Sequence, residues 1–228
     1  MSRRCWPGRS HPPRNSHHDI KGDHAMRRII AIIYVSLDGV MQAPGGPEED
    51  PGGGFVHGGW AMPRWDEMMN GLLAELLDRP FALLLGRKTY EIFAGYWPHH
   101  TDNPIGRKFD AAVKYVMTRR LDRLDWAGSE RVDAAGVARL KSGEGPQIHV
   151  WGSGNALRAL TAAGLVDEYR LWIFPLILGG GKRLFEPGLP ATALTLADTK
   201  VSTTGVVINT YRPAGPVALP AEGLGKAE

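Results

Sequence analysis

Apolar and polar residues alternate in blocks that predict strands and helices in turn. Residues 28–36, 81–85 and 114–118 are short apolar runs typical of buried strands. Between the first two, residues 64–78 repeat apolar side chains at helical spacing, which predicts an amphipathic helix that Pro80 ends. Further elements follow the same patterns: helices are expected at 86–94, 105–113 and 134–141, and a short strand at 130–132.

Residues 147–178 form the segment around which the other elements are arranged. An apolar run at 148–151 predicts a strand, and residues 152–155 (Gly-Ser-Gly-Asn) turn the chain. A helix follows until Gly164, and residues 169–178 form a second apolar run. A strand–helix–strand unit predicts parallel strands with the helix packed on one face of the sheet.

The last strands differ from the rest. Residues 194–202 and 206–212 are strand-like and are separated only by Thr203-Thr204-Gly205, which predicts an antiparallel hairpin. The remaining chain shows no internal repeat and no linker. We therefore expect a disordered extension at 1–25, one α/β domain at 26–213 and a loose tail at 214–228. We expect Met26 to be the native start, with residues 1–25 as upstream sequence or a tag-like extension; a functional basic tail is the alternative.

Composition and charge limit the binding partners and the kinds of site that are expected. The net charge is +3, but the five basic and two acidic residues of segment 1–25 account for it, so the remainder is balanced and nucleic acid is not expected as a partner. No apolar run is long enough for a membrane span. One cysteine, Cys5, excludes an internal disulfide, which fits a cytoplasmic location. His99-His100 lacks a third ligand, so no metal site is expected.

Three turns carry residues suited to anions, each at the carboxyl end of a predicted strand. A glycine in such a turn lets backbone approach a ligand, and the first amides of the following helix are unpaired. Taken alone, each turn could equally be a tight or solvent-exposed turn that binds no ligand. Because parallel strands share their carboxyl edge, the three together predict an extended, multiply phosphorylated ligand. They are Gly86-Arg87-Lys88-Thr89, Thr118-Arg119-Arg120 and Gly152-Ser153-Gly154-Asn155.

The last of these turns matches the dinucleotide-binding fingerprint only in part. Gly152 and Gly154 fit its first two glycines, but Leu157 occupies the third glycine position. Acidic residues follow after about a dozen positions, earlier than the roughly twenty that the fingerprint requires. A nucleotide-binding α/β fold other than the Rossmann fold is therefore favoured.

Three further motifs are V-S-L-D-G-V-M at 35–41, L-L-L-G-R-K-T-Y-E at 83–91 and V-W-G-S-G at 150–154. Together they resemble the dihydrofolate reductase superfold. The likeness is to the branch that holds the reductase domain of the bifunctional riboflavin-biosynthesis deaminase–reductase and its stand-alone bacterial relatives. Residues 175–186 (P-L-I-L-G-G-G-K-R-L-F-E) resemble the stand-alone relatives in particular. The resemblance covers about residues 27–212.

The resemblance implies a single-domain, three-layer dihydrofolate reductase-like fold, with a mostly parallel sheet, helices on both faces and a C-terminal antiparallel hairpin. It also implies NADPH as hydride donor and a homodimer. Residues 86–89 would hold the dinucleotide phosphates, and Thr118, Arg119 and Arg120 would flank the adenosine and its 2′-phosphate. Residues 152–157, with Asn155 and Leu157 among them, would cradle the pyrophosphate near the nicotinamide.

Two carboxylates are candidates for the catalytic acid. Folate reductases place an acid two residues after a Leu-Pro, but here that position is Trp65 and Asp66 comes one residue late. Asp66 is equally explained as an acid that favours the helix dipole. Asp38 follows the first strand, and its alternative role is that of a turn residue.

Aromatic residues are plentiful beside these acids. Trp60, Trp65, Phe93 and Trp97 are candidates for the wall of a pocket for a flat heterocycle, and the alternative is that they are core residues.

Three functions remain open from the sequence. The first is an NADPH-dependent oxidoreductase that transfers hydride to a small heterocyclic or carbonyl substrate. The second is a 5-amino-6-(5-phosphoribosylamino)uracil reductase of riboflavin biosynthesis, for which Arg64, Arg107 or Lys108 could supply the substrate phosphate site. The third is a non-catalytic NADPH-binding module.

Overall fold

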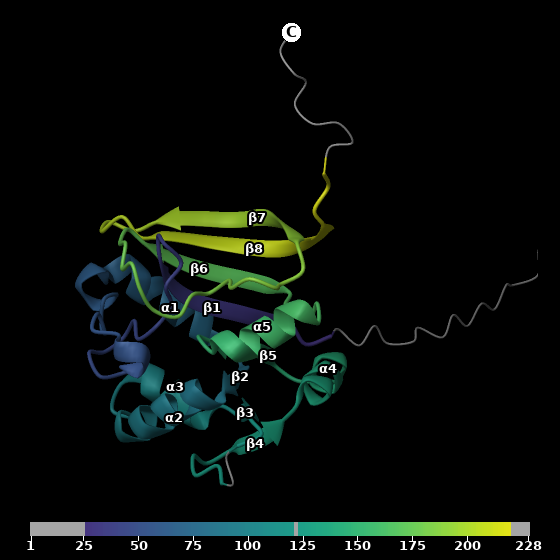
Figure 1. Ribbon diagram of the computed structural model, residues 1–228. Helices are drawn as coiled ribbons and strands as arrows, with labels where there is room; N and C mark the ends of the chain where they lie inside the picture. Colours follow the sequence, from purple (N-terminus) through teal and green to yellow (C-terminus); the bar gives the residue numbers. More distant parts are fainter. Residues whose placement is uncertain (1–25, 121–122, 220–228) are drawn as a thin grey trace, which may run out of the picture.

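Eight strands form one sheet in the order β4-β3-β2-β5-β1-β6-β8-β7, as the computed structural model shows for residues 26–120 and 123–219 (Figure 1). The extension 1–25, with Cys5, and residues 220–228 of the expected tail lie outside the described residues. The strands are β1 Ile29–Ser36, β2 Phe81–Gly86, β3 Lys114–Met117, β4 Ser129–Val132, β5 Gln147–Trp151, β6 Glu168–Phe174, β7 Thr192–Val201 and β8 Val207–Pro216.

Five α-helices occur in the described chain. They are α1 Glu67–Asp78, α2 Arg87–Tyr96, α3 Pro104–Ala111, α4 Ala134–Ser142 and α5 Gly154–Ala162. Short 3-10 turns lie at Gly52–Gly54, Met62–Arg64 and Trp97–His99.

The sheet is parallel from β4 to β6 and antiparallel at its end. β1 pairs with β5 on one side and with β6 on the other, both in parallel, whereas β8 pairs antiparallel with β6 and with β7. Helices make the parallel crossovers except the one from β3 to β4, whose described residues form no helix, and the antiparallel pair β7–β8 needs only a hairpin. These observations confirm the predicted mostly parallel sheet and its C-terminal hairpin.

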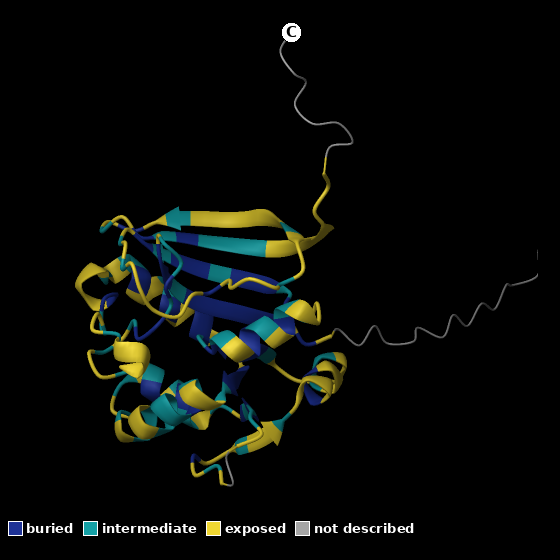
Figure 2. Ribbon diagram, viewed as in Figure 1, coloured by how far each residue is buried: buried dark blue, intermediate teal, exposed yellow. Residues whose placement is uncertain are grey.

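Successive residues of the central strands contribute to two separate cores. Ile30 and Ile32 of β1 pack with residues of α1, α2 and α3, while Ile29, Ala31 and Ile33 pack with residues of α4 and α5. Because both faces of these strands are covered, they read as continuous apolar runs rather than as alternating ones. Figure 2 shows the central strands in dark blue and the outer strand β7 mostly in yellow. The predicted three layers are thereby confirmed.

The unit β5–α5–β6 follows the sequence closely. Helix α5 ends where Gly164 takes a left-handed backbone (φ +65°), and the Gly164 and Leu165 amides donate to the carbonyls of Thr161 and Leu160. This is a Schellman motif, which pairs the last carbonyls of a helix.

Several element boundaries differ from the prediction; among them, the strand expected at 169–178 ends at Phe174 and the helix expected at 105–113 ends at Ala111. The first helix begins at Glu67 rather than at residue 64, because Met62–Arg64 forms a 3-10 turn and Asp66 caps the helix. Strand β8 continues to Pro216, so it extends into the segment expected to be a loose tail.

Candidate cofactor and substrate site

The three anion-compatible turns lie beside one another at one edge of the sheet. They follow β3, β2 and β5, which are consecutive parallel neighbours, so their carboxyl ends meet there. The turns after β2 and β5 are bonded directly: the Gly86 amide donates to Ser153 Oγ over 2.9 Å, and the Ser153 amide donates to Thr89 Oγ1 over 3.1 Å. The sequence prediction that these turns share one edge is therefore confirmed.

The turn after β5 has an unusual backbone. Gly152 and Ser153 both have positive φ angles, of +52° and +60°, and Ser153 is a buried non-glycine residue in this region. Its hydroxyl also donates to the Trp151 carbonyl over 2.9 Å. Left-handed backbone at a non-glycine residue costs free energy, and such residues cluster at functional sites.

Two of the five described α-helices begin without a side-chain cap. Helices α1, α3 and α4 begin with Asp66, Asn103 and Asp133, whose side chains accept hydrogen bonds from amides of the first turn. Helices α2 and α5 begin at Gly86 and Ser153 and have no such bond. Unpaired first-turn amides and the positive end of the helix dipole favour an anion. The uncapped helices are those that follow the adjoining turns after β2 and β5.

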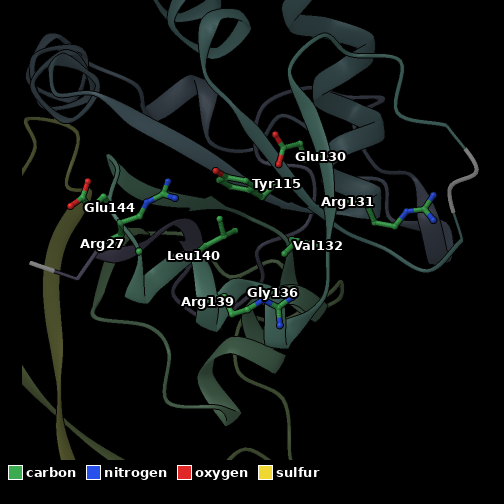
Figure 3. A pocket seen from close by; sticks show the side chains of 10 residues that line it. Arg27, Tyr115, Glu130, Arg131, Val132, Gly136, Arg139, Leu140 and Glu144 are labelled. Carbon is green, nitrogen blue, oxygen red and sulfur yellow. The ribbon is translucent and has the colours of Figure 1, made fainter. Parts of the chain in front are cut away.

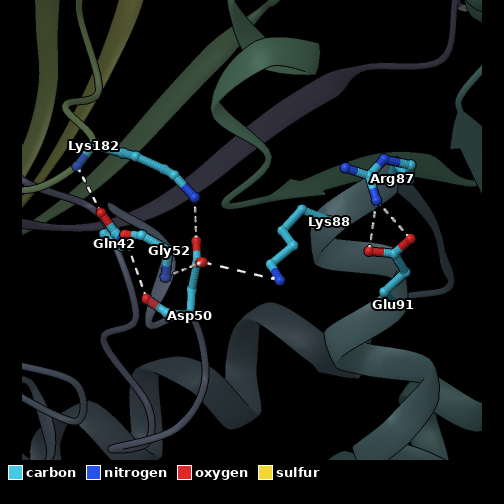
Figure 4. Close-up of polar contacts among 7 residues, drawn as sticks. All are labelled: Gln42, Asp50, Gly52, Arg87, Lys88, Glu91 and Lys182. Carbon is cyan, nitrogen blue, oxygen red and sulfur yellow. Dashed lines mark hydrogen bonds and ion pairs between the residues drawn. The ribbon is translucent and has the colours of Figure 1, made fainter. Parts of the chain in front are cut away.

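The basic side chains of the turn after β2 have acidic partners in this structure (Figure 4). Arg87 Nη1 lies 2.7 and 2.9 Å from the two carboxylate oxygens of Glu91, one helical turn ahead. Lys88 Nζ lies 4.0 Å from the carboxylate of Asp50 in the long Gly/Pro-rich loop 42–59. Both cations are therefore at the predicted edge, and each has a carboxylate of this chain as its partner.

A basic groove of about 540 Å³ adjoins the turn after β3. Arg119 lines it together with Arg131 of β4 and Arg139 of α4, which the sequence analysis did not single out. Arg120 is exposed and is not among the lining residues, and its amide donates to Thr118 Oγ1 over 3.1 Å. The full lining is Thr118, Arg119, Arg131, Val132, Asp133, Gly136 and Arg139.

A second cavity of about 320 Å³ shares four lining residues with this groove and extends along α4 (Figure 3). Figure 3 shows Arg27 and Glu144 at one end and Arg131 at the other. Arg27 is buried, its Nε donates to the Pro146 carbonyl over 2.7 Å, and its guanidinium carbon lies 5.6 Å from the centre of the Tyr115 ring. Arg27 therefore joins the start of β1 to the turn before β5.

Leu157 does not belong to the cofactor site. Its side chain is buried in the core between α5 and the sheet, with Leu160 and Val150. The third position after Gly154 faces the sheet rather than the edge, so the Leu157 side chain, which the family resemblance placed at the cofactor, packs in the core instead. Asn155, by contrast, is exposed at the start of α5.

Asp38 is held by four donors. Its carboxylate accepts from Ser36 Oγ (2.6 Å) and from the amides of Leu178 (3.1 Å) and Gly179 (3.0 Å), and Arg183 Nη2 lies 3.6 Å away. The Ser36 hydroxyl, followed by these amides, lowers the pKa of Asp38 to about 2. The carboxylate is therefore ionised at neutral pH. This geometry supports a structural role in the turn after β1, rather than the role of a proton donor.

Asp66 is also occupied by structural bonds. One oxygen accepts from the Met69 amide over 2.9 Å as the cap of α1, and the other accepts from the Thr203 amide (2.8 Å) and hydroxyl (2.6 Å). These bonds, with that of the Thr203 hydroxyl first, lower the pKa of Asp66. The helix-cap alternative is thus supported, and Asp66 also fastens the β7–β8 turn to α1.

The four aromatic candidates lie in two parts of one hydrophobic core. Trp60 is buried against Phe174, and Trp65 stacks on Trp172 with ring centroids 5.5 Å apart. Phe93 and Trp97 instead contact Phe109 of α3. Neither cavity described above is lined by them. The core alternative therefore holds for Trp60, and the other three are partly buried side chains packed against the same core.

Glu49 is an acid that the sequence analysis missed. Its Oε2 accepts from the amides of Gly45 and Gly46, over 2.6 and 3.1 Å. Burial raises the pKa of Glu49, and the pKa of the partly buried Tyr34 phenol at the carboxyl half of β1 is raised by desolvation and then by the negative charge of Glu49. Glu49 differs from the other acidic residues of the loop only in how the folded loop surrounds it. No sequence pattern reveals this difference.

Two kinds of site are absent from the described ranges 26–120 and 123–219. No helix there is long and apolar enough to cross a membrane. No group of three or more His, Cys, Asp or Glu side chains in these ranges is arranged to hold a metal ion.

Comparison with known proteins finds similarity over most of this chain. The model of the RibD C-terminal domain family matches residues 27–208. The uncharacterized protein YyaP of Bacillus subtilis is 28% identical over 195 residues, which cover 81% of this chain and 94% of that protein.

Solved structures share the fold at low sequence identity. A putative riboflavin biosynthesis protein from Shewanella sp. PV-4 is 19% identical, with a TM-score of 0.58 over 82% of this chain and 98% of its own. Dihydrofolate reductase from Enterococcus faecalis, complexed with NADP(H) and RAB-propyl, is 16% identical, with a TM-score of 0.51 over 82% of this chain and 96% of its own. The dihydrofolate reductase-like fold is thereby confirmed, and because the family model spans most of the sequence, this chain belongs to the RibD C-terminal domain family.

Proposed function

We propose that this protein is an NADPH-dependent reductase of a small heterocyclic or carbonyl substrate. One observation carries the proposal: the adjoining turns after β2 and β5 begin the two helices that lack side-chain caps. The arginine-lined groove continues this edge at the next strand, β3. An extended dinucleotide with a diphosphate and a further phosphate matches this row of anion sites. Membership of a reductase-domain family supports the same conclusion.

The chain's own residues would bind and orient the cofactor. The backbone at residues 86–89 and 152–155 would hold the diphosphate, because a glycine at the start of each turn lets it come close to the amides. Thr118 and Arg119, in a groove with Arg131 and Arg139, would hold the 2′-phosphate. When bound, the nicotinamide would supply the hydride. Catalysis would then depend mostly on positioning.

The proton donor is proposed to be Glu49 or a water molecule. Asp38 is ionised at neutral pH, and both oxygens of Asp66 accept structural hydrogen bonds. Glu49 lies on the loop that packs at the same edge, and burial raises its pKa, so a protonated form is more accessible. If the Glu49→Gln variant turns over an accepted substrate at the wild-type rate, water rather than Glu49 is the proton donor.

A riboflavin-pathway reductase remains the second candidate. The family match favours it, because the RibD C-terminal domain gives the family its name. A phosphoribosylamino-pyrimidine substrate would need a phosphate site separate from that of the cofactor. A non-catalytic NADPH-binding module is the third candidate, and binding without oxidation across a substrate panel would favour it.

A homodimer is proposed as the functional unit. The β7 edge strand supports this, because Leu194, Leu196 and Val201 are exposed on it and its outer edge has no partner strand in the described sheet. Light scattering on the purified protein would measure the mass directly. A monomeric mass at micromolar concentration would overturn the proposal.

A fluorescence titration with NADPH and, separately, NADH tests the cofactor assignment. Tighter binding of NADPH is expected, because only NADPH carries the 2′-phosphate. Arg119→Met is expected to weaken NADPH binding about tenfold while it leaves NADH binding nearly unchanged. Arg123→Met is the matched control, since Arg123 is exposed, pairs with Asp125 and does not line the groove. Absence of binding for both nucleotides would reject the reductase proposal.

A further inference from the structure

The carboxylate of Asp50 lies between two lysine side chains that come from distant parts of the chain. Lys182 Nζ is 2.5 Å from its Oδ2, and Lys88 Nζ is 4.0 Å from its Oδ1. We propose that Lys88 and Lys182 form a binding site for a phosphate group of the ligand, and that Asp50 fills this site in the ligand-free protein. The identity of that ligand as a dinucleotide rests on the proposed function, whereas the anion site itself does not.

The exposure of the three side chains supports this assignment. The Asp50 side chain is only 9% exposed, whereas those of Lys88 and Lys182 are 51% and 54% exposed. The carboxylate is therefore the enclosed member, and both ammonium groups remain accessible from solvent. Figure 4 shows both lysines extended toward Asp50, while Arg87 turns toward Glu91.

The location of the site favours phosphate over other anions. Lys88 is the second residue of α2, one of the two helices without a side-chain cap. The helix dipole adds to the positive charge of the two ammonium groups there. A phosphate monoester or diphosphate carries more negative charge than one carboxylate and has more acceptor oxygens. It can therefore displace Asp50 from the lysines.

Hydrogen bonds that do not involve the carboxylate also hold the backbone around Asp50. The buried Gln42 side chain donates to the carbonyls of Asp50 (2.9 Å) and Gly52 (2.8 Å), and its oxygen accepts from the Lys182 amide (2.9 Å). The loop is thus joined to the segment after β6 by bonds that do not involve the carboxylate. Displacement of Asp50 by a ligand then requires a side-chain rotation rather than the unfolding of the loop.

Glycine at position 52 leaves the space that this arrangement needs. A Cβ atom there would lie 2.9 Å from Asp50 Oδ1 and 3.5 Å from Lys182 Nζ. The Gly52 amide also donates to Asp50 Oδ1 over 3.2 Å. The Asp50 carboxylate therefore accepts from one backbone amide and one ammonium group, with the Lys88 ammonium group 4.0 Å away, and donors of these kinds suit phosphate oxygens.

The assignment makes Asp50 a competitor of the ligand. Its negative charge neutralises part of the charge of the two lysines, so an incoming phosphate must replace an existing ion pair. Removal of that charge without a change of shape should strengthen binding of phosphate compounds. Removal of the Lys182 charge should weaken binding of phosphate compounds. In a variant that also lacks the Asp50 charge, it should cancel the gain in affinity.

Calorimetric titration with inorganic pyrophosphate at fixed ionic strength tests the site without the cofactor. Asp50→Asn is expected to bind pyrophosphate about tenfold more tightly than the wild type. Lys182→Met is expected to bind more weakly, and the double variant should lose the gain of Asp50→Asn. Asp198→Asn is the matched control, because Asp198 pairs with Lys200 over the same 2.5 Å on β7, the edge strand at the antiparallel end of the sheet. It should leave pyrophosphate binding unchanged.

Three outcomes would overturn the proposal: equal or weaker pyrophosphate binding in Asp50→Asn, a gain that persists in the double variant, or an equal gain in Asp198→Asn. A thermal melt of each variant shows whether it is folded. If Asp50→Asn is unstable, the single variant Lys182→Met provides a second test. NADPH titration of the same proteins separates the two proposals. Failure of NADPH to bind while Asp50→Asn gains pyrophosphate affinity would reject the cofactor and retain the anion site.

Discussion

The Ser153 amide donates a hydrogen bond to the Thr89 hydroxyl over 3.1 Å, although the two residues are 64 positions apart in the chain. This bond, with the one from the Gly86 amide to Ser153 Oγ, joins the starts of α2 and α5. The two helix N-termini are thereby held in a fixed relation. Thr89 consequently has a positioning role in addition to any contact with a phosphate.

Replacement of Thr89 by valine tests this bond with little change in shape. The Ser153 amide would lose its acceptor, so the free energy of unfolding should fall by about 1–2 kcal/mol. NADPH binding should weaken as well, because the two turns would no longer be held together. Urea denaturation and the NADPH titration measure the two effects. Thr89→Ser keeps the oxygen and should restore most of both, whereas wild-type behaviour of Thr89→Val would assign no role to the bond.

Ser153 combines a strained backbone with two useful hydrogen bonds, and two substitutions separate these effects. Ser153→Ala retains the left-handed strain and loses both bonds, so we expect a loss of about 2 kcal/mol in the free energy of unfolding. Ser153→Gly loses the same bonds but relieves the strain, and should be more stable than Ser153→Ala by about 1 kcal/mol. Equilibrium urea denaturation gives both values. The reverse order of stability would mean that the backbone at Ser153 is not strained.

Local patterns were sufficient to predict the elements and the edge where the site lies. Apolar runs gave the central strands, and the glycine turns at 86–89 and 152–155 could be placed together because parallel strands share their carboxyl edge. Gly164 was correctly predicted to end α5, since only a residue that tolerates positive φ suits that position. These inferences depend on residues close together in sequence.

Contacts between distant segments could not be predicted in the same way. Asp50 and Lys182 are 132 positions apart, and Asp38 binds amides 140 and 141 positions away. The arginines at 131 and 139 join the groove only because β4 and α4 pack beside the turn after β3. A carboxylate's role as acid, cap or counter-ion depends on such partners, so sequence alone left these roles open.

Asp38 should affect stability rather than the pH dependence of turnover. Its folded pKa of about 2 lies below the ordinary value of 3.8, so its contribution to stability is complete above pH 3.8 and is lost as the pH falls toward 2. Asp38→Asn should lower the thermal midpoint at pH 7 by a few degrees. The difference from the wild type should shrink below pH 4. Turnover of an accepted substrate at 25 °C should be retained, and its loss in a folded variant would return Asp38 to the mechanism.

His149 provides a pH-dependent test of the core. Its ring is fully buried, stacks on Phe81 with centroids 4.7 Å apart, and has no hydrogen-bond partner for either nitrogen in the described chain. Burial, and then the charge of Arg170, lowers the pKa of His149 from 6.5 to about 3. Between these values the unfolded state binds one more proton than the folded state. Stability should therefore decrease as the pH falls from 6.5, by up to about 1.4 kcal/mol per pH unit.

Urea denaturation of the wild type and of His149→Leu between pH 4.5 and 6.5 measures this contribution. Leucine is apolar and cannot bind a proton, so His149→Leu should lose that part of the slope, and its stability relative to the wild type should rise as the pH falls. His99→Leu is the matched control, because His99 is exposed. It should keep the wild-type slope. Equal slopes for His149→Leu and the wild type would show that the imidazole reaches water or a partner and titrates in the folded state much as it does in the unfolded chain.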